Sequence, residues 1–174
     1  FLSGRASLAV VVAPFRALCQ EITNSLRNAF VDDDVQINQL SDALQPDYLS
    51  ELLDLLGVTE VAKPHVVVLT PEKLLYVLRQ RPDLVERIGL VIYDEGHQFD
   101  TGRRGVTYEL LLTSIKRLLG PNAQTVLISA VILNATALAS WLLSDVDKVV
   151  FDSAMQTQRA IAFASWNDQL GQLS

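Results

Sequence analysis

A short apolar run that ends in two adjacent acids is the feature that most constrains this chain. The run is Leu-Val-Ile-Tyr at residues 90–93, and Asp94, Glu95, Gly96 and His97 follow it directly. Such a run is typical of a strand buried in a parallel sheet, and ligands of open α/β sheets bind just beyond the carboxyl ends of the strands. Acids at that position can hold magnesium or activate a water molecule, although solvated acids at a strand end can also merely begin a turn.

Apolar stretches of this kind alternate with amphipathic stretches along the chain. The alternation is typical of the α/β class, in which a parallel sheet has helices on both faces. We expect strands at residues 8–13, 35–38, 65–69, 90–93, 124–129 and 148–151. We expect helices between Pro14 and Phe30, at residues 46–56, after Thr70 as N-cap with Pro71 in the first turn, at residues 105–119, and between Asn134 and Leu143.

Composition places the chain among ordinary globular domains. It has 174 residues, of which 49% are hydrophobic, enough for one domain with its own core. No apolar run reaches the roughly 20 residues of a membrane span, and the single cysteine, Cys19, fits a cytoplasmic setting without disulfides. The net charge of -6 argues against a broad basic surface for nucleic acid but leaves room for local phosphate contacts. Because the sequence begins without Met and loosens in composition after Asp152, we expect a piece of a longer protein.

Four short motifs stand at the carboxyl ends of predicted strands. They are Pro14-Phe15-Arg16, Thr70-Pro71-Glu72-Lys73, Asp94-Glu95-Gly96-His97 and Ser129-Ala130-Val131. In this order and spacing they resemble motifs Ia, Ib, II and III of superfamily 2 DEAD/DEAH-type helicases. The stretch from the first motif to the last spans most of the chain. Two further elements are similar to the superkiller-type branch of that superfamily: Arg104-Gly105 with Glu109, and Trp141-Leu142.

The resemblance implies a fold, an activity and a set of ligands. The fold would be a RecA-like first motor lobe over residues 1–152, a P-loop NTPase fold without its P-loop segment, and residues 153–174 would form the interdomain linker and the start of a second lobe. The activity would be that of an ATP-dependent helicase or translocase, with ATP and magnesium as cofactors. The partners would be the second RecA-like lobe and a nucleic acid, RNA or DNA, contacted through its backbone without sequence preference.

The resemblance also implies a role for each motif. Asp94 would hold magnesium with the nucleotide, Glu95 would act as general base, and His97 would relay the nucleotide state to motif III. Motif III would couple hydrolysis to movement through Ser129, Ala130 and Val131. The remaining two motifs would contact the nucleic acid through Pro14, Phe15, Arg16, Thr70, Pro71, Glu72 and Lys73.

Plain structural interpretations of several residues stay open at this point. Arg16 can be a surface charge, Thr70 an N-cap alone, and Lys73 a solvated cation. We expect His65 to pack or cap at the start of its strand, and Trp141 to pack in the core or between lobes.

The chain also departs from the family pattern. No Gly is followed by Lys, so the phosphate-binding loop of motif I is absent, and we expect this segment alone not to hydrolyse ATP. Phe15 and Val131 each stand where the family usually has Thr, and Gly96 replaces a more common Ala. These changes leave a second hypothesis open, in which a degenerate lobe acts as a binding scaffold for nucleic acid or protein. A metal hydrolase built on the two acids and the histidine of motif II is a third.

Overall fold

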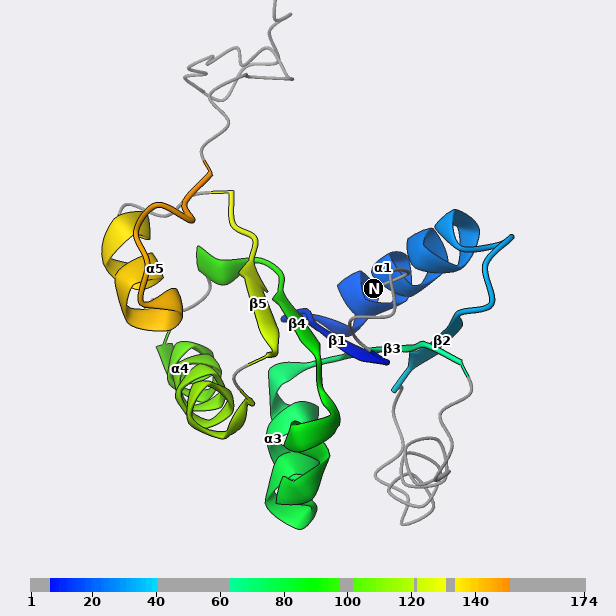
Figure 1. The fold of residues 1–174 in the computed structure, drawn as a ribbon, viewed down its shortest axis with the longest axis horizontal. Coiled ribbons are helices and arrows are strands. Elements are labelled where there is room, and N and C mark those ends of the chain that lie inside the picture. The colour runs from blue at the N-terminus through cyan, green and yellow to red at the C-terminus, as the bar shows by residue number, and fades with distance from the viewer. Residues whose placement is uncertain (1–6, 41–62, 98–101, 121, 131–133, 151–174) are drawn as a thin grey trace, which may run out of the picture.

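The described part of the chain is an alternation of strands and helices. A computed structural model describes residues 7–40, 63–97, 102–120, 122–130 and 134–150, with side chains from residue 105 onward in the third range. Its elements in chain order are β1 (Leu8–Val12), α1 (Arg16–Ala29), β2 (Gln36–Gln39), β3 (His65–Leu69), α3 (Pro71–Gln80), the 3-10 helix η1 (Pro82–Arg87), β4 (Leu90–Tyr93), α4 (Gly102–Leu118), β5 (Gln124–Leu127) and α5 (Ala135–Leu143), as Figure 1 shows.

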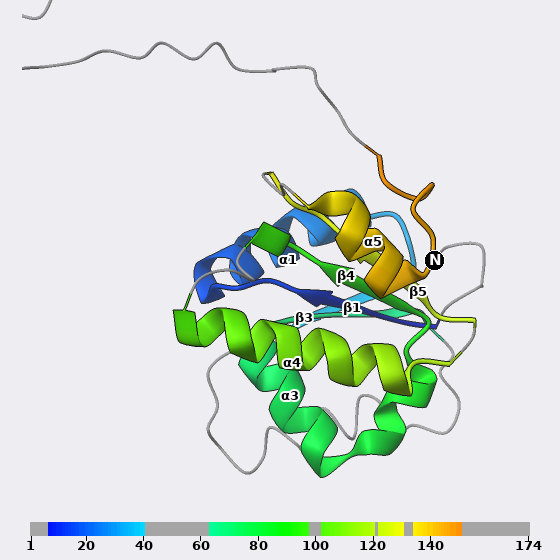
Figure 2. The same ribbon diagram turned by 90° about the vertical axis from the view of Figure 1, so that its left-hand side faces the viewer.

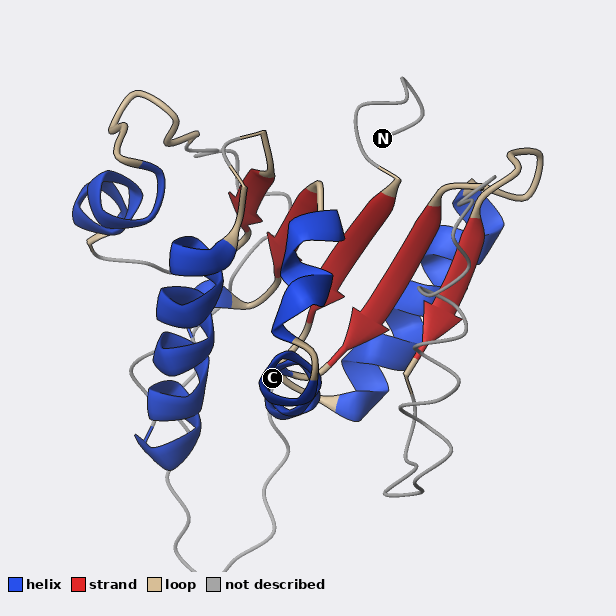
Figure 3. Cartoon of the chain, turned by 60° about the horizontal axis from the view of Figure 1, so that its bottom comes forward, coloured by secondary structure: helices blue, strands red, loops and turns tan. Residues whose placement is uncertain are grey.

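The five described strands form one parallel sheet. Their order is β2-β3-β1-β4-β5, so β1 lies at the centre. Val12 at its end is level with Leu69 of β3 on one side and with Tyr93 of β4 on the other. The carboxyl ends of the strands therefore lie along one edge of the sheet, which the arrowheads in Figure 3 mark.

Helices cover both faces of this sheet, which confirms the predicted layering (Figure 2). Ala9 and Val11 of β1 belong to the core cluster under α1. Val10 and Val12 belong to the cluster that α3, η1 and α4 cover. Successive strand residues point to opposite faces, so a strand covered on both sides has to be apolar at every position. This requirement explains why β1 reads as a continuous apolar run.

The helices bury the stripes that their sequences predict. In α4, Tyr108, Leu111, Leu112 and Ile115 are each at most 2% exposed. Thr70 stands at the N-cap of α3 with Pro71 next to it, but the Thr70 side chain makes no capping hydrogen bond. The capping prediction is therefore right in its position, but the side chain of Thr70, which is buried, makes no capping bond.

The last predicted strand is wrong for residues 148–150. Asp145 accepts a hydrogen bond from the Asp147 amide at 3.0 Å and forms an ion pair with Lys148 at 3.7 Å. These local bonds hold a turn, and Val150 beyond it is 92% exposed. An apolar pair of residues is too short to form a strand when no neighbouring strand covers it.

Two predicted features fall outside the described residues, and one described element was not expected. The predicted helix at residues 46–56 and the boundary at residue 152 lie outside the described residues. The 3-10 helix η1 was not predicted. No described helix is both long and apolar enough to cross a membrane.

Candidate functional site

The turns that carry the four motifs lie side by side at the carboxyl edge of the sheet. The Asp94 amide donates to the Val12 carbonyl at 2.9 Å, so the motif II turn leaves the sheet beside the end of β1. The Ala13 amide donates to the Leu69 carbonyl at 3.1 Å, which brings the turn after β1 next to the turn after β3. The pairing of neighbouring strands thus assembles residues that lie far apart in the sequence.

The peptide between Asp94 and Glu95 is held at both of its polar atoms. Its carbonyl, that of Asp94, accepts a hydrogen bond from the Tyr108 hydroxyl at 2.8 Å. Its amide, that of Glu95, donates to the Asp94 carboxylate oxygen Oδ1 at 2.9 Å. Glu95 itself has a φ of 55°, in the left-handed region that few non-glycine residues adopt.

The Glu95 carboxylate lies beside the His97 ring. Glu95 Oε2 and His97 Nδ1 are 3.1 Å apart, and the two side chains are 37% and 33% exposed, respectively. Motif II therefore presents an acid and an imidazole together, both within reach of solvent. The predicted contact of His97 with motif III stays a prediction.

Gly96 of motif II packs tightly against the end of β5. Its amide donates to the Ile128 carbonyl at 2.8 Å. A Cβ at this position would lie 2.6 Å from Leu127 Cδ2 and 2.9 Å from Leu127 Cγ, both closer than carbon atoms pack. The Leu127 side chain thus gives a packing reason for glycine at a position where the family more often has Ala.

Motif III begins beside motif II, as predicted. The Ile128 amide donates to the Tyr93 carbonyl at 2.8 Å, so Ser129 follows directly after the strand contact. The Ser129 hydroxyl oxygen is buried and has no hydrogen-bond partner among the described residues. Ala130 is exposed, and Val131 lies outside the described residues, so the coupling role of this motif stays a prediction.

The turns after β1 and β3 frame an open depression at the same edge. The predicted residues Arg16, Thr70 and Lys73 line it. The other lining residues are Ala17, Cys19, Gln20, Gln39 and Leu40, none of which was a predicted site residue. The Lys73 amine donates to the Leu40 carbonyl at 2.6 Å, so this cation is anchored at the end of β2 rather than extended into solvent. Arg16 is exposed. No pattern in the sequence indicates Gln39, because only the pairing of β2 with β3 brings it here.

The other residues of these two turns divide between core and surface. Pro14, Pro71 and Thr70 are buried, whereas Phe15 is 43% exposed and Glu72 is exposed. Phe15 occupies the N-cap position of α1 and, unlike Thr, has no side-chain oxygen with which to cap the helix. The exposed atoms of this surface thus come mainly from Phe15, Arg16 and Glu72.

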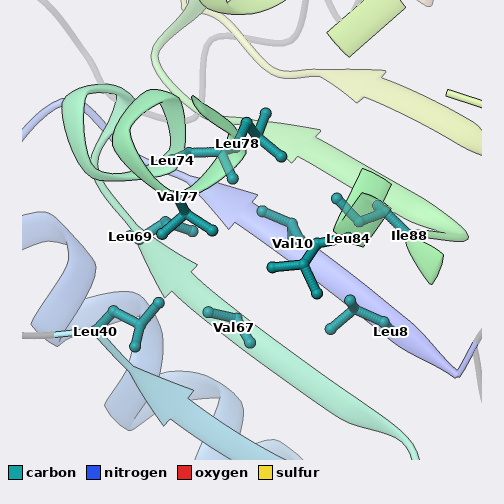
Figure 4. Close-up of a pocket in the computed structure, with 10 residues that line it drawn as sticks. All are labelled: Leu8, Val10, Leu40, Val67, Leu69, Leu74, Val77, Leu78, Leu84 and Ile88. Atoms are coloured by element: carbon teal, nitrogen blue, oxygen red, sulfur yellow. The ribbon is translucent and has the colours of Figure 1, made fainter. Parts of the chain in front are cut away.

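A separate hollow lies between α3 and the face of the sheet (Figure 4). Leu, Val and Ile side chains line it completely: Leu8, Val10, Leu40, Val67, Leu69, Leu74, Val77, Leu78, Leu84 and Ile88. Most of these residues belong to the main core cluster. A nucleotide phosphate would find no polar partner there, so the hollow belongs to the core rather than to the site.

Comparison with known proteins decides the family. A model described as "DEAD/DEAH box helicase" matches residues 2–138. The chain belongs to the DEAD/DEAH box helicase family. The match confirms the predicted resemblance and includes motifs Ia, Ib, II and III at the strand ends described above.

Relatives of this DEAD/DEAH box chain are much longer proteins. It is 36% identical over 140 residues to the Hachiman protein HamB of Bacillus cereus, which covers 80% of this chain and 12% of HamB. It is also 36% identical over 83 residues to the ATP-dependent DNA helicase Hel308 of Methanocaldococcus jannaschii, covering 48% of this chain and 7% of that protein. The chain thus spans about an eighth or less of these two relatives.

Solved helicase structures share the fold. The helicase Lhr of Mycobacterium smegmatis, solved with single-stranded DNA and AMP-PNP, matches with a TM-score of 0.57 at 21% identity over 80% of this chain and 19% of Lhr. Mss116p, solved with single-stranded RNA and AMP-PNP, matches with a TM-score of 0.57 at 18% identity over 82% of this chain and 28% of that one. These matches confirm that the parallel sheet and its helices have the RecA-like fold.

Proposed function

We propose that this chain works as part of an ATP-driven motor that moves along nucleic acid, as a helicase or translocase. The observation that supports this most is the position of Asp94 and Glu95 at the end of β4. The turn that carries Arg16 follows β1, the strand next to β4 in the sheet. Hydrolysis and track binding can influence each other when both sites act on the same structural elements. Adjacent strand ends of one sheet provide such elements.

Asp94 is suited to hold a magnesium ion together with a nucleotide. Magnesium is usually bound by one or two carboxylates plus phosphate oxygens and water, rather than by a cage of side chains. The Glu95 amide takes one of the roughly four acceptor positions of the Asp94 carboxylate, which fixes its orientation and leaves acceptor capacity for a cation. A bound magnesium ion would supply positive charge to the nucleotide phosphates.

Glu95 is suited to act as general base. Its carboxylate is partly exposed, so a water molecule can reach it, and its Oε2 lies 3.1 Å from His97 Nδ1. It would accept a proton from the attacking water, a contribution that is typically worth 10²–10⁴ in rate. The different environments of the two acids thus suit different tasks.

The depression between the turns after β1 and β3 is suited to a nucleic-acid backbone. Arg16 and Lys73 give it positive charge in a chain whose net charge is -6, and the Lys73 amine is held in place by the Leu40 carbonyl. Contacts of this kind address phosphates and do not read sequence. Because several relatives are named DNA helicases, single-stranded DNA is the first track to test, with RNA as the comparison.

We propose that the working motor contains further chain, including a phosphate-binding loop. The edge strand β5 supports this, since Val126 is 42% and Ile128 is 52% exposed there, whereas parallel sheets are normally covered on both faces. Additional structure on this side would bury both side chains. Gly96, one of the departures behind the scaffold hypothesis, has a packing explanation in Leu127 and so gives that hypothesis little support.

A pair of phosphate-release assays tests this function. The full-length protein that contains the segment should hydrolyse ATP, and single-stranded nucleic acid should stimulate the reaction. The 174-residue chain alone should stay at background, because the phosphate loop supplies much of the grip on the triphosphate. A full-length protein that binds single strands but hydrolyses no ATP would contradict the motor and favour the scaffold. Turnover by the short chain that disappears in Glu95→Gln would contradict the need for a phosphate loop.

A further inference from the structure

The motif II turn depends on a residue that lies outside motifs Ia, Ib, II and III, one position before Glu109. Tyr108 is in the first half of α4, and its side chain is 2% exposed. Its hydroxyl reaches across to the Asp94 carbonyl at 2.8 Å. The sequence predicts Tyr108 only as one member of the apolar stripe of this helix, where a Leu or Phe would serve equally well.

The bond is placed so that it controls one peptide plane. The Asp94 carbonyl and the Glu95 amide belong to the same rigid peptide unit. Tyr108 holds the carbonyl end, and the Asp94 carboxylate holds the amide end. The fixed plane sets the orientation of the backbone at Glu95, which has a φ of 55°. A non-glycine residue stays in this region only when surrounding contacts hold it there.

Tyr108 is held rigidly enough to act as a fixed donor. Its ring packs against Tyr93 with centroids 6.2 Å apart and planes tilted by 58°. Its ring is buried, and its O–H donates to the Asp94 carbonyl from this fixed position.

We infer that Tyr108 is a positioning residue that clamps the Asp94–Glu95 peptide and thereby sets the direction of the Glu95 carboxylate. Tyr108 touches neither nucleotide nor water in this role. It acts through the backbone, at the carbonyl of the peptide from which the Glu95 side chain departs. The catalytic consequence rests on the proposed function, whereas the clamp itself does not.

The clamp is tested in the 174-residue chain by amide hydrogen exchange followed by NMR. Tyr108→Phe removes the hydroxyl and keeps the ring. The Glu95 amide should then exchange about 3- to 10-fold faster, the range that corresponds to the net worth of one hydrogen bond. The Asp94 amide, which donates to Val12 within the sheet, should keep its rate and reports on general destabilisation. Tyr93→Phe is the matched control, because it removes a hydroxyl from the neighbouring ring and leaves the Tyr108 bond in place.

Three outcomes of this experiment are decisive. Faster exchange at Glu95 alone, absent in Tyr93→Phe, supports the clamp, whereas equal acceleration at Asp94 and Glu95 shows loss of packing and overturns it. Unchanged exchange at both amides overturns it as well.

The catalytic consequence is measured separately in the full-length protein. Tyr108→Phe should lower kcat for ATP about 3- to 10-fold with little change in KM. An unchanged kcat would show that the clamp does not serve Glu95. A full-length protein without any ATPase activity would instead refute the proposed function and leave the exchange result standing.

Discussion

Gly96→Ala should destabilise the chain, and Leu127 should be the reason. The new Cβ would lie 2.6 Å from Leu127 Cδ2 and 2.9 Å from Cγ, so the leucine has to move by about 1 Å to reach an ordinary carbon–carbon distance. The contact with the Ile128 carbonyl oxygen, at 3.3 Å, is tight as well. Overpacking of this kind costs about 1–3 kcal/mol.

A second effect of the substitution has the opposite sign. Gly96 does not have a positive φ, so Ala can adopt its backbone conformation and reduces the entropy of the unfolded chain, which stabilises the fold by about 0.4–1 kcal/mol. The two ranges differ by about 0–2.6 kcal/mol, so the net loss in free energy of unfolding should be about 1 kcal/mol.

A double-mutant cycle separates the two effects. Leu127→Ala removes both clashing carbons, so Gly96→Ala made in that background should be neutral or slightly stabilising. Urea denaturation followed by circular dichroism on the four variants gives the coupling free energy, which should be about 1–2 kcal/mol. If Gly96→Ala costs the same with Leu127 as with Ala at that position, packing against Leu127 is not what requires glycine in motif II.

Two further predictions concern the depression and the buried histidine. Arg16→Ala should weaken binding to unrelated single strands equally and lower the slope of log affinity against log salt concentration by about 0.7. Arg79→Ala, at the far end of α3, is the control and should change neither the affinity nor the slope. Fluorescence anisotropy across a salt series measures both quantities, and an unchanged slope in Arg16→Ala would show that Arg16 does not contact the nucleic acid. Burial, with a smaller effect of Arg87, lowers the pKa of His65 below 6.5, so the unfolded chain binds a proton at higher pH than the folded one and stability should fall as the pH drops below about 6.5. Urea titrations at several pH values should show that His65→Phe reduces this fall; an identical pH dependence in both proteins would assign it to other groups.

The sequence predicts most of the fold because burial on both faces leaves a clear mark. The strands at Leu90–Tyr93 and His65–Leu69 match their apolar runs residue for residue. The same reasoning fails at residues 148–150, where two valines follow a turn held by Asp145 and pair with none of the described strands. Periodicity reports what a segment can bury, but not whether a partner surface is there.

The candidate site could be predicted only in part. Asp94 and Glu95 stand out because they follow an apolar strand directly and match motif II of the helicase family. Tyr108, by contrast, reads as an ordinary core residue, since a hydroxyl that reaches another element leaves no local pattern. The bond from Lys73 to the Leu40 carbonyl is equally invisible, because it joins residues 33 positions apart.

The central claim is that Asp94 and Glu95 divide the work of ATP hydrolysis, and one pair of variants tests it most directly. In the full-length protein, nucleotide affinity and single-strand-stimulated turnover should be measured for Asp94→Asn and Glu95→Gln. Asp94→Asn should weaken binding of magnesium and ATP. Glu95→Gln should leave that binding largely intact and slow turnover by about 10²–10⁴-fold. Equal losses of nucleotide affinity in both variants, or normal turnover in Glu95→Gln, would contradict the account.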